Sequence, residues 1–331
     1  MAYWLAMQGK RLYWHDYKRT GFYMVTLSTA PRRPLFGRCF DNQTELSPEG
    51  LVVCSHWRQI SEREPRIETS MLVVMPDHLH GILFVKEPLE QALGASIRGF
   101  KSGVTSELRK LNENPSLQVW EPGYHQVISL NPNTLQACKR YIRDNPRRYC
   151  IKKAHPDLFI RLEHLNDTYL PKVKPPLSWA GFGNPFLLEA PSLRAIQVSR
   201  SITDDALADL RAEIGEASQN GAVCVSPFIS PGEQAIVEDI VRSPKGCVIV
   251  LKHAGFPALY KPGTRYFDLC AQGRVLILSP YPYTTTQPKL SRERCLEMND
   301  MVAYMCRHGD DVLRGNGENE RRLQRAPSLV P

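Results

Sequence analysis

Short apolar runs and amphipathic stretches alternate along the first part of the chain, and this pattern predicts four strands and two helices. The strands are expected where β-branched and aromatic residues concentrate, at 22–28, 67–75, 79–85 and 124–130. The helices are expected at 47–59, opened by Ser47 and Pro48, and at 96–111. The resulting order, βαββαβ, is typical of an α+β ferredoxin-like domain, whose four-stranded sheet leaves one face for further elements.

A third helix is expected to begin at 131–133 and to end near Asn145, because Pro146 disfavours helical backbone in the residue before it. Leu135, Cys138 and Ile142 form its apolar stripe. This helix is a candidate to cover the open face of the sheet.

The second half of the chain alternates apolar strands with helices. Strands are expected at 193–198, 222–225, 247–251 and 275–279. Helices are expected from about 203 and about 231, at 263–271 and at 291–307. The alternation predicts an α/β Rossmann-like domain, a parallel sheet with helices on both faces. Gly181-Phe182-Gly183 lacks a third glycine and a preceding strand, so no dinucleotide fingerprint is expected there.

We therefore expect two domains, 1–172 and 177–308, joined by the Lys- and Pro-rich stretch 172–176. The polar, Arg- and Glu-rich residues 309–331 are expected to form a disordered tail.

The composition, 42% hydrophobic and 23% charged residues, is that of a soluble globular protein. No apolar run approaches the roughly 20 residues that a membrane helix needs, and the first residues do not have the form of a signal peptide. Nine cysteines at irregular spacing, without a C-x-x-C motif, argue against a disulfide framework and against a zinc cage. A reducing, cytoplasmic location is expected.

The net charge of +8 is concentrated in the first half of the chain. Residues 1–174 hold 25 basic and 17 acidic residues, whereas residues 175–331 hold 17 of each. The segment 138–153 is the most basic, with seven Lys and Arg against Asp144. A solvated helix face would explain this segment, but its density also favours a polyanionic partner, most simply nucleic acid.

Two histidines stand at the start of the third expected strand. Successive side chains on a strand alternate faces, so His78 and His80 point the same way, together with Ile82 and Phe84. Two adjacent imidazoles can bind one cation, although a histidine pair can also simply end a hairpin. Pro76-Asp77 is a turn signal in front of the pair, which places it where a strand pair begins.

Tyr141 and Asn145 lie one turn apart on or beside the apolar stripe of the third helix. The tyrosine could be an ordinary core residue, but an amide on a buried face needs a hydrogen-bond or metal partner. If the helix crosses the open face of the sheet, both residues approach the histidine pair. Lys139, Arg143 and Arg147 are expected to form an adjacent basic row on the same helix. Together with Arg98 and Lys101 on the preceding helix, they are the residues expected to bind DNA.

Three segments carry a resemblance to a known family: M-P-D-H-L-H-G-I-L, V-W-E-P-G-Y-H and C-K-R-Y-I-R-D-N-P. Over residues 20–152 the chain resembles the HUH single-strand DNA transposases, in particular the REP-associated tyrosine transposases of bacteria. The resemblance implies a divalent metal, Mg²⁺ or Mn²⁺, held by His78, His80 and Asn145. It also implies that Tyr141 is the nucleophile and single-stranded or hairpin DNA the substrate.

The expected reaction is a transesterification that yields a 5′-phosphotyrosine and a free 3′-hydroxyl. It needs no ATP, and the chain contains no G-x-x-x-x-G-K-[ST] motif. Asp77 is interpreted as a turn residue. The oligomeric state is not predicted.

Residues 190–306 resemble the DNA-processing protein A family, whose Rossmann-like domain binds single-stranded DNA. The chain departs from that family at Asp300 and in the glycine-poor stretch 226–232. Two alternatives stay open: a protein that binds hairpin or single-stranded DNA without cutting it, and a nucleotide-processing or nucleoprotein-assembly function in the second domain.

Overall fold

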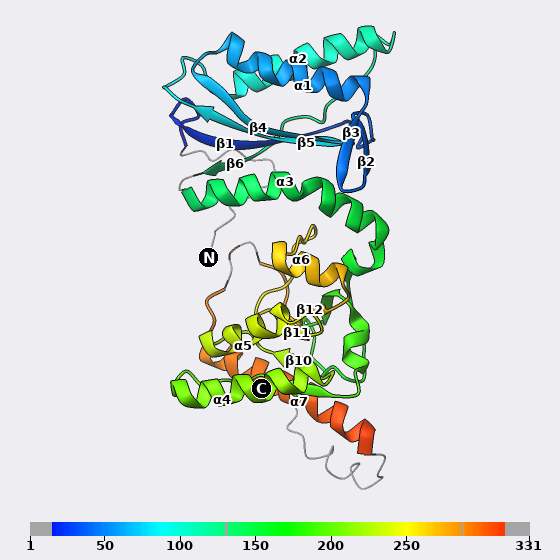
Figure 1. Cartoon of the computed structure of the whole chain (residues 1–331), viewed down its shortest axis with the longest axis vertical. Coiled ribbons are helices and arrows are strands. Elements are labelled where there is room, and N and C mark those ends of the chain that lie inside the picture. Colours follow the sequence, from blue (N-terminus) through cyan, green and yellow to red (C-terminus); the bar gives the residue numbers. More distant parts are fainter. Residues whose placement is uncertain (1–14, 130–131, 285, 287, 315–331) are drawn as a thin grey trace. The chain divides into compact units, whose positions relative to one another are not determined.

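The computed structural model describes residues 15–129, 132–284, 286 and 288–314, and the chain divides into two compact units, 1–154 and 155–331 (Figure 1). Both units combine helices with β-sheet. No helix among the described residues is long and apolar enough to span a membrane.

The first unit is built on a four-stranded antiparallel sheet in the order β4-β5-β1-β6. Its strands are β1 (Gly21–Ser28), β4 (Ile67–Met75), β5 (His78–Val85) and β6 (His125–Ser129). These bounds confirm the four expected strands to within a residue or two. Leu130, the expected end of the last strand, lies outside the described residues.

Helices cover both faces of this sheet: α1 (Pro48–Arg63) and α2 (Gly94–Leu111) lie on one face and α3 (Pro132–Ala154) on the other (Figure 1). Ser47 caps α1 through its side chain, as expected from the sequence. The alternation along β5 divides its side chains between two cores. Leu79 and Leu83 pack with α1 and α2, while Ile82 packs with Cys138 and Ile142 of α3.

Gly81 fixes the distance between β5 and α1. A Cβ atom at this position would lie 2.2 Å from Cζ2 of Trp57, which packs against the strand. Only a glycine permits this approach of the buried Trp57 ring to the backbone.

The expected end of α3 near Asn145 is wrong, because the helix continues through Pro146 to Ala154. Proline removes one intrahelical hydrogen bond, and the loss of one bond within a 23-residue helix is offset by packing. Cys138, Ile142 and Pro146 itself are buried along the same side of α3. The expected cap residue Asn131 lies outside the described residues.

A two-stranded hairpin, β2 (Gly37–Phe40) and β3 (Gln43–Leu46), was not predicted. Asp41 and Asn42 connect its strands with φ angles of 47° and 60°, the left-handed backbone that a type I′ turn requires. The Asp-Asn pair was the available signal for this turn.

The second unit contains a six-stranded sheet in the order β7-β8-β12-β11-β10-β9. Four of its strands are parallel, as expected: β9 (Leu193–Ala195), β10 (Val223–Ser226), β11 (Cys247–Leu251) and β12 (Val275–Ser279). Two further strands were not predicted: β7 (Arg161–Leu162) at the edge of the sheet, and β8 (Ala180–Gly183), which lies between β7 and β12 and runs antiparallel to both. Gly181 and Gly183 therefore belong to a strand and not to a phosphate-binding turn.

Helices cover both faces of this second sheet. The cores place α4 (Asp204–Gln219), α5 (Pro231–Arg242) and α6 (Thr264–Ala271) on one face and α7 (Arg292–Arg314) on the other. The parallel strands follow one another in chain order, so successive right-handed crossovers place their helices on the same face. Two short 3₁₀ helices, Pro156–Phe159 and Pro185–Glu189, complete the unit.

The expected boundary at residue 172 is displaced. The stretch before it belongs to the second unit, because Leu170 lies in that unit's core and the Trp179 indole donates a hydrogen bond to the carbonyl oxygen of Pro171. At the other end, α7 continues to Arg314, so the first residues of the expected tail 309–331 are helical. Residues 315–331 lie outside the described residues.

Candidate active site

The two histidines of β5 lie on the sheet face that α3 covers. Their ring centroids are 4.8 Å apart with the planes at 79°. The antiparallel register pairs His78 with Ser28 and His80 with Thr26 on β1. Both rings are shielded from solvent: His80 is 5% exposed, and the His78 side chain is 12% exposed.

Both imidazoles are held through their Nδ1 atoms. The Asp77 carboxylate lies 2.6 Å from Nδ1 of His78, and the Thr26 hydroxyl lies 2.7 Å from Nδ1 of His80. A metal ion would therefore bind through Nε2 of each ring, with Nδ1–H donating to the oxygen, as is usual for metal-binding histidines. Thr26 was not predicted, and Asp77 does more than form a turn.

Asp77 is ionised in this setting. Burial alone would raise its pKa, but the hydrogen bond and electrostatic interaction with His78 and the positive charge of Arg32 outweigh that effect and lower the pKa below its usual value. Arg32 donates to Asp77 at 3.4 Å and to the Ser28 hydroxyl at 3.0 Å. The sequence showed Arg32 only as part of a basic loop, and the structure brings it to the edge of the site.

The helix α3 brings Tyr141 against the histidine pair. The ring centroids of Tyr141 and His80 are 5.2 Å apart with the planes at 70°. Asn145 follows one turn later and is 8% exposed, and its Nδ2 donates to the Tyr141 carbonyl oxygen at 3.4 Å. With Nδ2 engaged in this way, Oδ1 is the atom that could contact a cation.

The candidate metal site has few protein ligands, but the orientation of these ligands suits a divalent cation. Among the described residues, no group of three or more His, Cys, Asp or Glu side chains is placed to hold a metal ion. The candidate site consists of two imidazoles and one amide, which leaves coordination positions for phosphate oxygens and water.

Arg148 is a site residue that sequence reasoning missed. It is 9% exposed, and its guanidinium carbon lies 5.9 Å from the centroid of the Tyr141 ring. The available signal was its position seven residues after Tyr141, about two full turns along the same side of the helix.

The basic row of α3 is not beside Tyr141, contrary to expectation. Lys139 and Arg143 each lie two residues from Tyr141, about 200° around the helix, and so on its other side. Arg147 is paired with Asp144, with its Nε 2.6 Å from the carboxylate. Whether this row contacts DNA stays a prediction.

The two basic residues of α2 are also separated from Tyr141, because α2 packs on the opposite face of the sheet. Arg98 is exposed there. The Lys101 ammonium donates to the carbonyl oxygens of Glu121 and Gly123 at 2.8 and 2.9 Å, and burial lowers its pKa. Lys101 therefore has a structural role, fastening the segment before β6 to α2.

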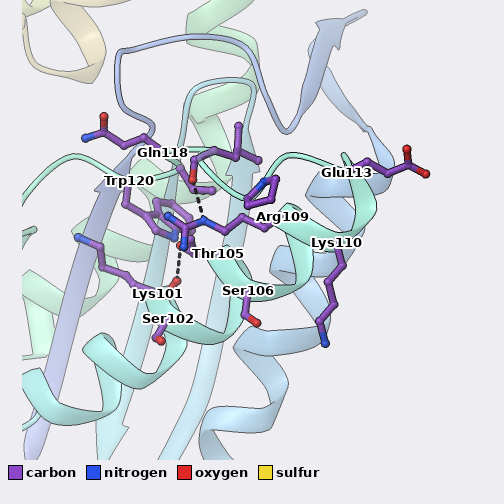
Figure 2. A pocket seen from close by; sticks show the side chains of 12 residues that line it. Lys101, Ser102, Thr105, Ser106, Arg109, Lys110, Glu113, Gln118 and Trp120 are labelled. Carbon is purple, nitrogen blue, oxygen red and sulfur yellow. Dashed lines mark hydrogen bonds between the residues drawn. The ribbon is translucent and has the colours of Figure 1, made fainter.

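A pocket lies on this α2 side of the first unit (Figure 2). Lys101, Arg109 and Lys110 line it together with Trp120 and the hydroxyl groups of Ser102 and Thr105. It contains neither histidine of the pair nor Tyr141, so this pocket is separate from the candidate chemistry.

Comparisons with known proteins find one relative in sequence and several solved structures of low similarity. No protein-family model matches the chain. A protein of Haemophilus influenzae described as uncharacterized is 31% identical over 156 residues, which cover 41% of this chain and 86% of the relative.

Two of the solved structures that resemble this chain each match less than half of it. A REP-associated tyrosine transposase bound to a REP hairpin is 19% identical, with a TM-score of 0.34, over 43% of this chain and 74% of that one. DNA processing protein A from Helicobacter pylori, described with a single-stranded DNA binding mode, is 23% identical, with a TM-score of 0.35, over 45% of this chain and 66% of that one. Similarity at this level leaves the functional argument to the residues themselves.

Proposed function

We propose that this chain, which belongs to the same family as the uncharacterized Haemophilus influenzae protein, is a metal-dependent single-stranded DNA endonuclease and strand transferase acting on hairpin, REP-like DNA. In this proposal the first unit is a ferredoxin-like HUH domain and the second a Rossmann-like domain resembling DNA-processing protein A. The observation that carries the proposal is the cluster of three rings packed edge to face, in which Tyr141 lies against His80 and His80 against His78.

The reaction exchanges one phosphate ester for another. The Tyr141 hydroxyl oxygen attacks the scissile phosphorus, the bond from phosphorus to the 3′-oxygen breaks, and the phenolic proton passes to the departing 3′-oxygen. The products are a 5′-phosphotyrosine and a free 3′-hydroxyl, so the step needs neither ATP nor a redox partner. A second 3′-hydroxyl attacking the phosphotyrosine would complete strand transfer and restore Tyr141.

The metal, Mg²⁺ or Mn²⁺, would supply positive charge that polarises the scissile phosphate. His78 and His80 would hold it through Nε2 and Asn145 through Oδ1. Asp77 and Thr26 fix the orientation of the two rings through Nδ1. The buried charge of Arg148 beside the Tyr141 ring favours the anionic groups that gather during attack.

In this proposal, DNA is bound by basic residues outside the cluster of three rings. Lys139 and Arg143 lie on the other flank of α3 and would contact phosphates away from the cut, whereas Arg147 would have to exchange Asp144 for a phosphate. Arg98 could contact only a part of the DNA that reaches the α2 face. Lys101 is withdrawn from this set, because its ammonium is bound to backbone carbonyls.

The test uses one hairpin oligonucleotide with a single-stranded extension, labelled at either end, incubated with the full-length protein and Mn²⁺. The proposal predicts that the 3′ label becomes covalently attached to the protein, while the 5′-labelled fragment is released with a 3′-hydroxyl. His78→Ala and EDTA should each abolish the adduct. Tight binding of the same oligonucleotide without any adduct, over a range of hairpin sequences, would instead identify a protein that binds DNA without cutting it.

A further inference from the structure

Three basic residues of the second unit converge where two neighbouring parallel strands end. Lys252 directly follows β11, and its backbone N–H donates to the carbonyl oxygen of Leu278 on β12 at 2.7 Å. Arg294 on α7 donates to the backbone carbonyl oxygen of His253 at 3.2 Å. The Arg294 guanidinium also stacks on Tyr281, just beyond β12, with its carbon 4.0 Å from the ring centroid.

The charges of this cluster are not neutralised by ion pairing within the described part of the chain. None of the ion pairs between described residues involves Lys252, His253 or Arg294. The Lys252 ammonium contacts the carbonyl oxygen of Gly255 at 3.4 Å and lies 5.7 Å from the centroid of the Phe256 ring. The nearby Glu297 carboxylate accepts a hydrogen bond from the Tyr281 hydroxyl at 2.8 Å.

Lys252 and Arg294 both act electrostatically on His253. Burial lowers the pKa of Lys252. Burial and then the charges of Lys252 and Arg294 lower the pKa of His253. Buried charge without a counter-charge is costly, and a bound anion would compensate it. The carboxyl ends of parallel strands are also where α/β sheets commonly bind their ligands.

We infer that Lys252, His253 and Arg294 form a binding site for the phosphate group of a small phosphorylated molecule. The cations Lys252 and Arg294 match the double negative charge of a phosphate monoester, and His253 adjoins Lys252 in the chain and contacts Arg294 through its carbonyl oxygen. A small ligand is favoured over a nucleic-acid strand because residues 175–331 carry 17 basic and 17 acidic residues, a balance without an extended basic track. This inference does not depend on the chemistry proposed for the first unit.

The test measures calorimetric binding and thermal unfolding of the full-length protein with four probes. These are inorganic phosphate, a nucleoside 5′-monophosphate, the matching nucleoside, and an oligonucleotide without a terminal phosphate. Phosphate and the monophosphate should bind and raise the melting temperature, whereas the nucleoside should not. Lys252→Met and Arg294→Gln should each weaken binding by about tenfold or more, because each removes a charge-assisted hydrogen bond.

Matched variants separate binding from folding. Arg294→Lys keeps the charge and should retain most of the binding, and Arg242→Gln, an exposed change on α5, should leave it unchanged. Lys252→Met should also raise the melting temperature of the unliganded protein, since it removes a partly buried charge that has no ion-pair partner among the described residues. The inference is overturned if wild-type protein binds neither phosphate probe, if both site variants bind like wild type, or if only the oligonucleotide binds.

Discussion

The substitution Asp77→Asn tests how the site holds its histidines. The Asp77 carboxylate accepts from Nδ1 of His78 at 2.6 Å and from Arg32 at 3.4 Å, and asparagine keeps the shape but loses the charge. Removing the outer partner of a metal-binding histidine usually costs 10- to 100-fold in metal affinity, which corresponds to about 1.4–2.7 kcal/mol. We expect a decrease in Mn²⁺ affinity in that range.

The assay is calorimetric titration of Mn²⁺ into the full-length protein. The matched control is Asp239→Asn, which removes a carboxylate paired with Arg211 at 2.7 Å in the second unit and should leave Mn²⁺ affinity unchanged. Equal affinities for wild type and Asp77→Asn, within about twofold, would refute the idea that Asp77 orients His78 toward a metal.

The same carboxylate makes a prediction about pH. Its pKa is lowered in the folded state, so Asp77 contributes stability above the pKa of the unfolded chain, and this contribution is lost as the pH falls through the folded value. The difference in unfolding free energy between wild type and Asp77→Asn should therefore be present at neutral pH and shrink at pH values below about 4. A difference that persists unchanged into acid would show that the charge of Asp77 is not its source.

Three further predictions concern packing and DNA binding. Gly81→Ala should lower the unfolding free energy in urea by about 1–3 kcal/mol, because the added Cβ would lie 2.2 Å from the Trp57 ring, while Gly99→Ala, with no atom within 4 Å of the new Cβ, should cost nothing. Lys101→Met should lower stability by about 1–3 kcal/mol and leave DNA affinity unchanged, whereas a drop in affinity with normal stability would return Lys101 to the DNA-binding set. The triple substitution of Lys139, Arg143 and Arg147 by alanine should weaken binding of all hairpin and single-stranded DNAs alike. It should also reduce the slope of log K against log salt by about 0.7 for each phosphate that the protein no longer binds. An unchanged slope would mean that these three side chains are only solvated on the surface of α3.

The elements with a strong hydrophobic period were predictable from the sequence. The alternation in 67–85 predicted β4 and β5 close to their observed bounds, and it placed His78 and His80 on one face. The hairpin at 37–46 was not predicted, because its strands are only four residues long and carry no strong hydrophobic alternation. Exposed side chains such as Arg38 and Glu45 form an ion pair with each other and do not pack into a core. The end of α3 was also predicted too early, because the local effect of a proline on helix ends does not include the tertiary packing that stabilises the helix beyond Pro146.

The candidate site was predictable where residues share a strand or a helix stripe, and less so where the site depends on tertiary placement. Tyr141 and Asn145 lie on the buried side of α3 as expected. The sequence did not indicate which face of the sheet α2 would take, and so it did not show that the sheet separates Lys101 from Tyr141. Thr26 reaches His80 only through strand pairing across 54 positions of the chain, which no local pattern reveals.

The most direct test of the central claim is to locate the covalent bond. After reaction of full-length protein with the hairpin oligonucleotide and Mn²⁺, nuclease trimming and peptide mass spectrometry should find the nucleotide adduct on the peptide that carries Tyr141. Tyr141→Phe should form no adduct while its DNA affinity stays within a few-fold of wild type. An adduct that persists in Tyr141→Phe, or that maps to Tyr124 or Tyr149, would contradict the assignment of Tyr141 as the nucleophile.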